Sequence, residues 1–108
     1  MSEAMDALEA RVHRQLNLMH DLADRLAAIR VRETSPDGTV TAEVDGNGAL
    51  CDLVLAPAIS AMSPSEFESV VVATAGRAAH LAITRRGELV EAFNTELAES
   101  MPGYDSGH

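Results

Sequence analysis

Residues 35–57 read SPDGTVTAEVDGNGALCDLVLAP, and their pattern predicts two β-strands, each preceded by a tight turn. The turn SPDG (residues 35–38) has proline at the second position and glycine at the fourth, as β-turns favour. Residues 40–44 alternate apolar and polar side chains, which is typical of a half-buried strand. The loop DGNG (residues 45–48) fits a hairpin, because glycine and asparagine tolerate positive φ. Residues 49–55 then form a second strand that ends before a proline.

An extended segment at residues 31–34 adds a first strand, so the sheet is predicted to be a three-stranded antiparallel β-meander. Period-two alternation predicts that one face packs on the helices and buries three apolar side chains: Val44, Leu53 and Leu55. The polar side chains are expected to be more exposed: Thr41, Glu43 and Asp45. Leu50 and Val54 lie on the opposite face of the last strand, which predicts partial cover there too. We expect Cys51, on the apolar face, to be a buried structural thiol.

A long helix is predicted on each side of the sheet, which makes the fold class α+β. Residues 2–29 carry a heptad pattern whose a and d positions are apolar with one exception: Met5, Leu8, Val12, Gln15, Met19, Leu22, Leu26 and Ile29. The motif SPSE (residues 63–66) predicts a capping box at the start of the second helix. We expect one domain over residues 1–100 and a flexible tail over residues 101–108.

The heptad stripe is too long for a short sheet to cover, so it predicts a partner helix. Together with the second face of the last strand, the apolar members of the stripe form the predicted core and dimer contacts: Met5, Leu8, Val12, Met19, Leu22, Leu26, Ile29, Leu50 and Val54.

The formal charge of −9 is unevenly distributed along the 108 residues. Residues 1–32 hold five acids and five arginines, residues 33–68 hold seven acids and no base, and residues 69–108 hold five acids and three arginines. Such a chain is repelled by phosphate backbones unless its arginines gather on one face. No signal peptide is visible, and no apolar run approaches the roughly 20 residues of a membrane helix. We therefore expect a cytoplasmic protein without a membrane contact.

The residue pattern predicts neither catalysis nor a metal site. His13 and His20 share a helix face, but two helical turns place them about 10 Å apart, too far to share one ion. Asp37 and Asp45 occupy turn positions that favour aspartate for local hydrogen bonds, and no nucleophile or histidine partner accompanies them. The loop GNG (residues 46–48) is too short for a phosphate-binding loop. We expect a non-enzymatic protein without metal or cofactor.

The residues DGTVTAEVDGNGALCDLVLAP (37–57) resemble the YbaB/EbfC family of small bacterial nucleoid-associated proteins. The likeness consists of a glycine turn, a valine-rich strand, a D/N-G turn, a strand of the L-x-L-x-P type and a capped helix. Pro102-Gly103 is similar to a PG pair near the end of the family's second helix. The resemblance implies an intertwined, tweezer-like homodimer that binds DNA with little sequence preference.

Two kinds of partner remain open besides the second copy. DNA would be contacted through arginines, and the candidates are Arg11, Arg14, Arg25, Arg30, Arg32, Arg85 and Arg86. The competing interpretation pairs the arginine doublets with Glu33, with Glu88 or with an acidic surface of a partner. The acidic balance and the apolar stripes also suit a protein-binding accessory or chaperone-like factor. Some actinobacterial relatives of similar fold are associated with type VII secretion, and the acidic, lysine-free chain fits that branch at least as well. DNA binding would place the protein at the nucleoid.

Overall fold

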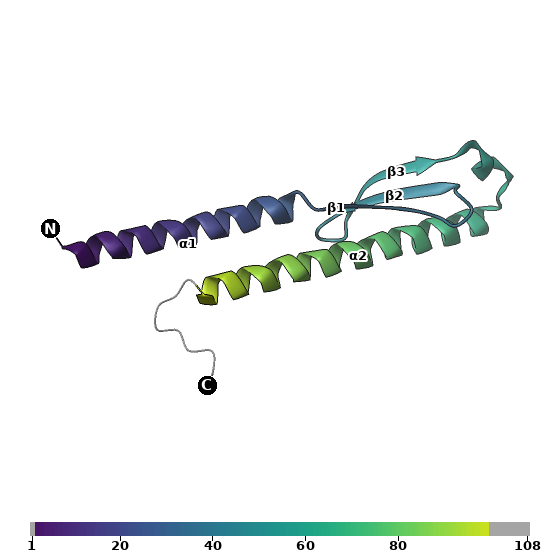
Figure 1. Ribbon diagram of the computed structural model, residues 1–108. Coiled ribbons are helices and arrows are strands. Elements are labelled where there is room, and N and C mark those ends of the chain that lie inside the picture. Colours follow the sequence, from purple (N-terminus) through teal and green to yellow (C-terminus); the bar gives the residue numbers. More distant parts are fainter. Residues whose placement is uncertain (1, 100–108) are drawn as a thin grey trace, which may run out of the picture.

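The computed structural model describes residues 2–99 and confirms the predicted order of helix, three strands and helix (Figure 1). The elements are α1 (Glu3–Ala27), β1 (Arg30–Thr34), β2 (Val40–Asp45), β3 (Leu50–Leu55), the 3-10 helix η1 (Pro57–Ala61) and α2 (Pro64–Glu99). The predicted tail, residues 101–108, lies outside the described residues. No helix among the described residues is long and apolar enough to cross a membrane.

Both long helices begin at side-chain caps that the sequence supplies. Ser2 Oγ accepts hydrogen bonds from the backbone N–H groups of Ala4 (3.1 Å) and Met5 (3.3 Å) at the start of α1. At the start of α2, Ser63 Oγ accepts from the Glu66 N–H (3.1 Å), and Glu66 Oε1 accepts from the Ser63 N–H (3.3 Å). The predicted capping box is therefore confirmed, and it fixes where α2 begins.

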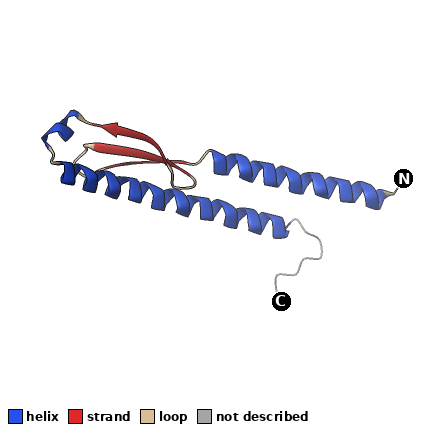
Figure 2. Ribbon diagram, turned by 180° about the vertical axis from the view of Figure 1, so that it is seen from behind, coloured by secondary structure: helices blue, strands red, loops and turns tan. Residues whose placement is uncertain are grey.

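Both the sheet and α1 pack on helix α2. The sheet lies on its first half and the C-terminal part of α1 lies on its second half, so that α1 and the sheet follow one another end to end (Figures 1 and 2). The N-terminal part of α1 extends beyond the end of α2. The result is an elongated two-layer body with principal extents of 75 × 30 × 15 Å. The junction between α1 and β1 therefore lies above the middle of α2.

The core forms where the inner face of the sheet meets α2. Strand order is β1-β2-β3, all antiparallel, and every second residue of β2 is buried: Val40, Ala42 and Val44. The α2 side chains beneath them are small and fully buried: Thr74, Ala78 and Ala82. Small side chains allow the helix to lie close to the sheet. Ile29 and Val31 complete this core at the start of β1.

Strand β3 departs from the predicted alternation. Glu43 pairs with Asp52 while its neighbour Val44 pairs with Leu50, so Cys51 is the extra residue of a bulge. The bulge pairs Leu50 with an inward-facing residue, whereas alternation had placed it on the other face. The prediction of a buried thiol is wrong for the described chain, because Cys51 is exposed.

The predicted burial of the strands is confirmed for β2 and only in part for β3. Val44 is buried, and Thr41, Glu43 and Asp45 are more exposed than their buried neighbours. Leu53 is half-buried, and the prediction fails for Leu55, which is 39% exposed. The reason is that α2 lies beneath β2 and β1 and leaves β3, at the opposite edge of the sheet from β1, largely uncovered.

The heptad stripe of α1 divides into a covered and an open part. Ile29 is buried, and Leu22 and Leu26 are half-buried. The open part consists of exposed side chains: Met5, Leu8, Val12 and Met19. Leu16, outside the predicted a/d set, is 44% exposed and lies one turn after Val12 on the same side. We call these five residues the open stripe.

Candidate nucleic-acid interface

Two arginines from distant parts of the sequence form hydrogen bonds at the junction of α1 and β1. Arg30 is the first residue of β1, and its Nη1 donates to the backbone oxygens of Ile29 (2.7 Å) and Ala27 (3.2 Å). Its guanidinium thus covers the C-terminal end of α1, where helix carbonyls carry partial negative charge. From α2, Arg85 Nη1 donates to the backbone oxygen of Arg30 (3.4 Å).

A third arginine reaches the same region through the β2–β3 loop. Arg86 Nη1 donates to Asn47 Oδ1 at 2.7 Å. The loop lies against α2 at Gly48, where a Cβ atom would be 3.4 Å from both Ala79 Cβ and Ile83 Cδ1. Gly48 also has a φ of +80°, a conformation that other residues adopt only with strain. We call Arg30, Arg85 and Arg86 the arginine cluster.

The arginine cluster keeps its positive charge available. All the hydrogen-bond acceptors of these three guanidinium groups are neutral: backbone oxygens and one amide. Among residues 2–99, none of the three forms an ion pair with a carboxylate. An arginine has five N–H donors, so most of them remain free for an anion. The cluster can therefore bind phosphate oxygens without first breaking an ion pair.

Comparison with known proteins identifies the family of the chain. Residues 1–97 match the model of the YbaB/EbfC DNA-binding family. The chain belongs to this family. The resemblance drawn from the turns and strands is thereby confirmed.

A solved structure of a bacterial protein shows the same fold. The crystal structure of the uncharacterized protein HP0035 from Helicobacter pylori has a TM-score of 0.62, with 89% of this chain and 98% of that chain covered. Sequence identity is 17%, so this likeness concerns the fold. No curated protein sequence matches the chain.

The other arginines proposed for DNA contact are not part of the cluster. Arg25 pairs with Asp21 at 3.0 Å on α1. Arg32 pairs with Glu43 at 2.9 Å on the outer face of the sheet, an acid that the competing interpretation did not name. These two guanidinium groups are already compensated by carboxylates of the same chain. In this member of the YbaB/EbfC family, the candidate arginines for DNA contact therefore differ in whether a carboxylate already pairs with them.

Two further candidates lie far from the junction, on the first half of α1. Arg14 is exposed there, and Arg11 is half-buried with its Nε lacking a hydrogen-bond partner among the described residues.

Arg77, on α2, was not among the candidates. It donates to the Thr34 backbone oxygen (3.5 Å) and lies 3.8 Å from Glu33 Oε1. The cluster thus unites three of the seven proposed arginines.

Asn47 is a member of the site that residue patterns did not single out. Sequence reasoning assigned it to a turn, and only the fold brings the loop to Arg86. No local signal in the sequence marks this contact, because Asn47 and Arg86 are 39 residues apart.

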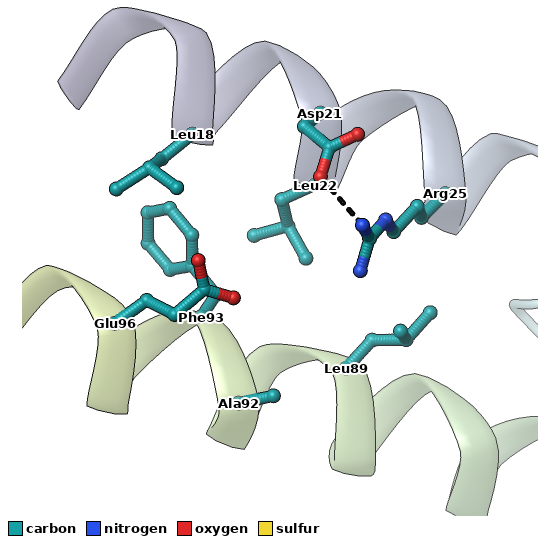
Figure 3. A pocket seen from close by; sticks show the side chains of 8 residues that line it. All are labelled: Leu18, Asp21, Leu22, Arg25, Leu89, Ala92, Phe93 and Glu96. Atoms are coloured by element: carbon teal, nitrogen blue, oxygen red, sulfur yellow. Dashed lines mark ion pairs between the residues drawn. The ribbon is translucent and has the colours of Figure 1, made fainter. Parts of the chain in front are cut away.

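Two other kinds of site are absent from the described residues: a metal centre, and a ligand cavity between α1 and α2. No group of three or more metal-ligating side chains gathers among residues 2–99. Between α1 and α2, the side chains of Leu18, Leu22, Leu89 and Phe93 point toward one another beside the Asp21–Arg25 ion pair (Figure 3). The space that they leave is about 20 Å³, which is enough only for a single water. This seam holds the helices together.

Proposed function

We propose that this YbaB/EbfC-family chain binds duplex DNA through the arginine cluster, with little sequence preference, at the bacterial nucleoid in the cytoplasm. The observation that carries the proposal is that Arg30, Arg85 and Arg86 hydrogen-bond at the α1–β1 junction and the β2–β3 loop beside it, and that none of them forms an ion pair with a carboxylate among the described residues. Guanidinium groups bind phosphate oxygens through charge-assisted hydrogen bonds. Contacts to phosphate position a protein on DNA and carry no sequence information.

The acidic balance of the chain makes this binding local and sensitive to salt. The net charge is −9, so attraction must come from the cluster and overcome repulsion from the rest. Each phosphate that an arginine neutralises releases counterions, and log Kobs falls with log[salt] by a slope of about −0.9 per phosphate. We expect a shallow total slope, because only a few arginines are free of carboxylates.

A mobility-shift series over salt concentration tests the proposal with matched variants. Arg85→Ala/Arg86→Ala removes two charges of the cluster and should lower both the affinity and the salt slope. Arg25→Ala/Arg32→Ala removes the same charge from arginines that are already ion-paired, and it should change binding much less. Equal losses in both double variants would contradict the proposed site. Absence of any shift at low salt would remove the DNA-binding proposal.

We also infer that the binding form is a homodimer. The open stripe is 44–52% exposed, and Leu50, Val54 and Leu55 of β3 are 39–51% exposed. Contiguous apolar surface of this kind is uncommon in proteins that remain monomeric. The heptad spacing of the open stripe supports a helix as its cover. A second copy would also double the number of arginine clusters on one DNA.

A second candidate function is that of a protein-binding accessory or chaperone-like factor, for example in type VII secretion. The observation in its favour is the combination of exposed apolar side chains with seven acids and no base in residues 33–68. Such a surface suits a basic protein better than DNA. Recovery of one specific protein from the native cell, with no DNA shift at any salt concentration, would favour this function. A clear salt-sensitive shift with an empty pull-down would favour DNA.

A further inference from the structure

The β2–β3 loop holds Asn47 in one place. Asp45 Oδ1 accepts hydrogen bonds from the backbone N–H groups of Asn47 (2.9 Å) and Ala49 (3.0 Å), and the Gly48 N–H donates to the Asp45 backbone oxygen (3.0 Å). The same loop is packed on α2 at Gly48. The side chain of Asn47 therefore leaves from a fixed backbone, next to the arginine cluster.

The hydrogen bond to Arg86 also settles which way the amide faces. A guanidinium group only donates, so the atom of Asn47 that lies 2.7 Å from Arg86 Nη1 must be the acceptor Oδ1. The Nδ2 group, with its two N–H donors, then faces away from this bond. Asn47 and Arg86 are both exposed, and Nδ2 has no partner among residues 2–99.

The pair presents the donors that a phosphate group accepts. Arg86 keeps Nε and Nη2 free, and Asn47 adds a neutral amide from a different element. Adjacent guanidinium and amide donors suit the two non-bridging oxygens of a phosphate, and both side-chain types contact DNA phosphates. Holding Arg86 through Oδ1 before DNA arrives lowers the entropy cost of ordering a long side chain.

We propose that Asn47 is a DNA-contacting residue, which donates from Nδ2 to a backbone phosphate and orients Arg86 through Oδ1. This assignment rests on the proposed function, since it adds a neutral contact to the phosphate site of the arginine cluster. The contributions of Asn47 and Arg86 to DNA binding should differ in their response to salt. A neutral donor releases no counterion, whereas an arginine does.

Mobility shifts with single variants test the contact. Asn47→Ala should weaken DNA binding about five- to tenfold while leaving the salt slope unchanged. Arg86→Ala should make the slope shallower by about 0.9. Asn94→Ala, an exposed asparagine on α2, is the matched control and should bind as the wild type does. Thermal melts by circular dichroism check folding, and Asn47 has no positive φ that alanine would strain.

A second comparison separates contact from orientation. In the Arg86→Ala background, adding Asn47→Ala should still weaken binding if Nδ2 touches phosphate. No further loss in that background would overturn the direct contact. If the wild type binds DNA and the Asn47→Ala and Asn94→Ala variants have the same affinity for it, the assignment of Asn47 is overturned. The proposed function then still stands. Failure of the wild type to shift DNA at low salt would overturn both.

Discussion

The side chain of Asp37 organises the first turn of the sheet. Its Oδ1 accepts from Ser35 Oγ (2.6 Å), Thr39 Oγ1 (2.7 Å) and the Thr39 N–H (3.0 Å). These hydrogen bonds, the one from Ser35 first, favour the charged form and lower the pKa of Asp37 from 3.8 to about 2. A turn residue that sequence patterns assign only to local hydrogen bonding is thus also a titrating group with a stability effect.

Acid should weaken the fold through Asp37. Its pKa is lower in the folded chain than in the unfolded chain, so its contribution is present above about pH 4 and is lost as pH falls toward 2. Asp37→Asn should lower the stability measured by urea unfolding at pH 5 and have a smaller effect near pH 2. Asp24→Asn, on the exposed side of α1, is the control. If the difference in unfolding free energy between Asp37→Asn and the wild type stays constant over this pH range, the lowered pKa of Asp37 is contradicted.

Two glycines should respond to alanine with opposite signs. Gly87 is inside α2, and a Cβ atom added there would meet nothing within 4 Å, so Gly87→Ala should stabilise the helix by about 0.5–1 kcal/mol. Gly48 has a φ of +80° and approaches α2 closely, so Gly48→Ala should destabilise by about 1–2 kcal/mol. Thermal melts measure both changes. A lower melting temperature for Gly87→Ala would indicate a contact that a single chain does not show.

At the level of elements, the contact between α2 and the sheet depends on small side chains. Ala78 and Ala82 are fully buried beneath the strands, whereas Ala73 is exposed on the same helix. Ala78→Leu should therefore overpack the core and cost about 1–3 kcal/mol. Ala73→Leu makes the same chemical change at an exposed position and should cost little. Urea unfolding of the two variants measures the difference, and equal stability would contradict this packing.

The elements could be predicted from sequence because their signals are local. Helix α1 was expected over residues 2–29 and runs over Glu3–Ala27, and the capping box gave the start of α2. Turn residues placed the three strands within about two residues. The 3-10 helix η1 was not predicted, because Pro57 was interpreted only as the end of a strand.

The sequence predictions that failed concern features set by contacts between residues distant in the chain. The bulge at Cys51 is a property of β2–β3 pairing, and no local pattern marks it. Exposure of Leu55 follows from the position of α2 beneath the other two strands. For the site, sequence supplied the arginines as candidates, but their separation into free and ion-paired ones required the fold. Asn47 was missed for the same reason.

For the whole molecule, the central question is how many chains the working form contains. The open stripe leaves Leu8 47% exposed, so a charge there should disturb association and spare the fold of each chain. We expect Leu8→Lys to be monomeric at micromolar concentration, with unchanged helix content by circular dichroism. Ala10→Lys, outside the a and d positions, is the control and should associate as the wild type does. A wild-type chain that sediments as a monomer would contradict the homodimer.

The elongated shape has a hydrodynamic consequence. The Cα radius of gyration is 21.4 Å, whereas a compact domain of this length would have about 13 Å. A rod-like particle experiences more friction and diffuses more slowly than a sphere of equal mass. Gel filtration calibrated with globular standards would therefore overestimate the mass of a single chain and could mistake it for two. Light scattering or sedimentation equilibrium, which report mass independently of shape, is the measurement that can count the chains.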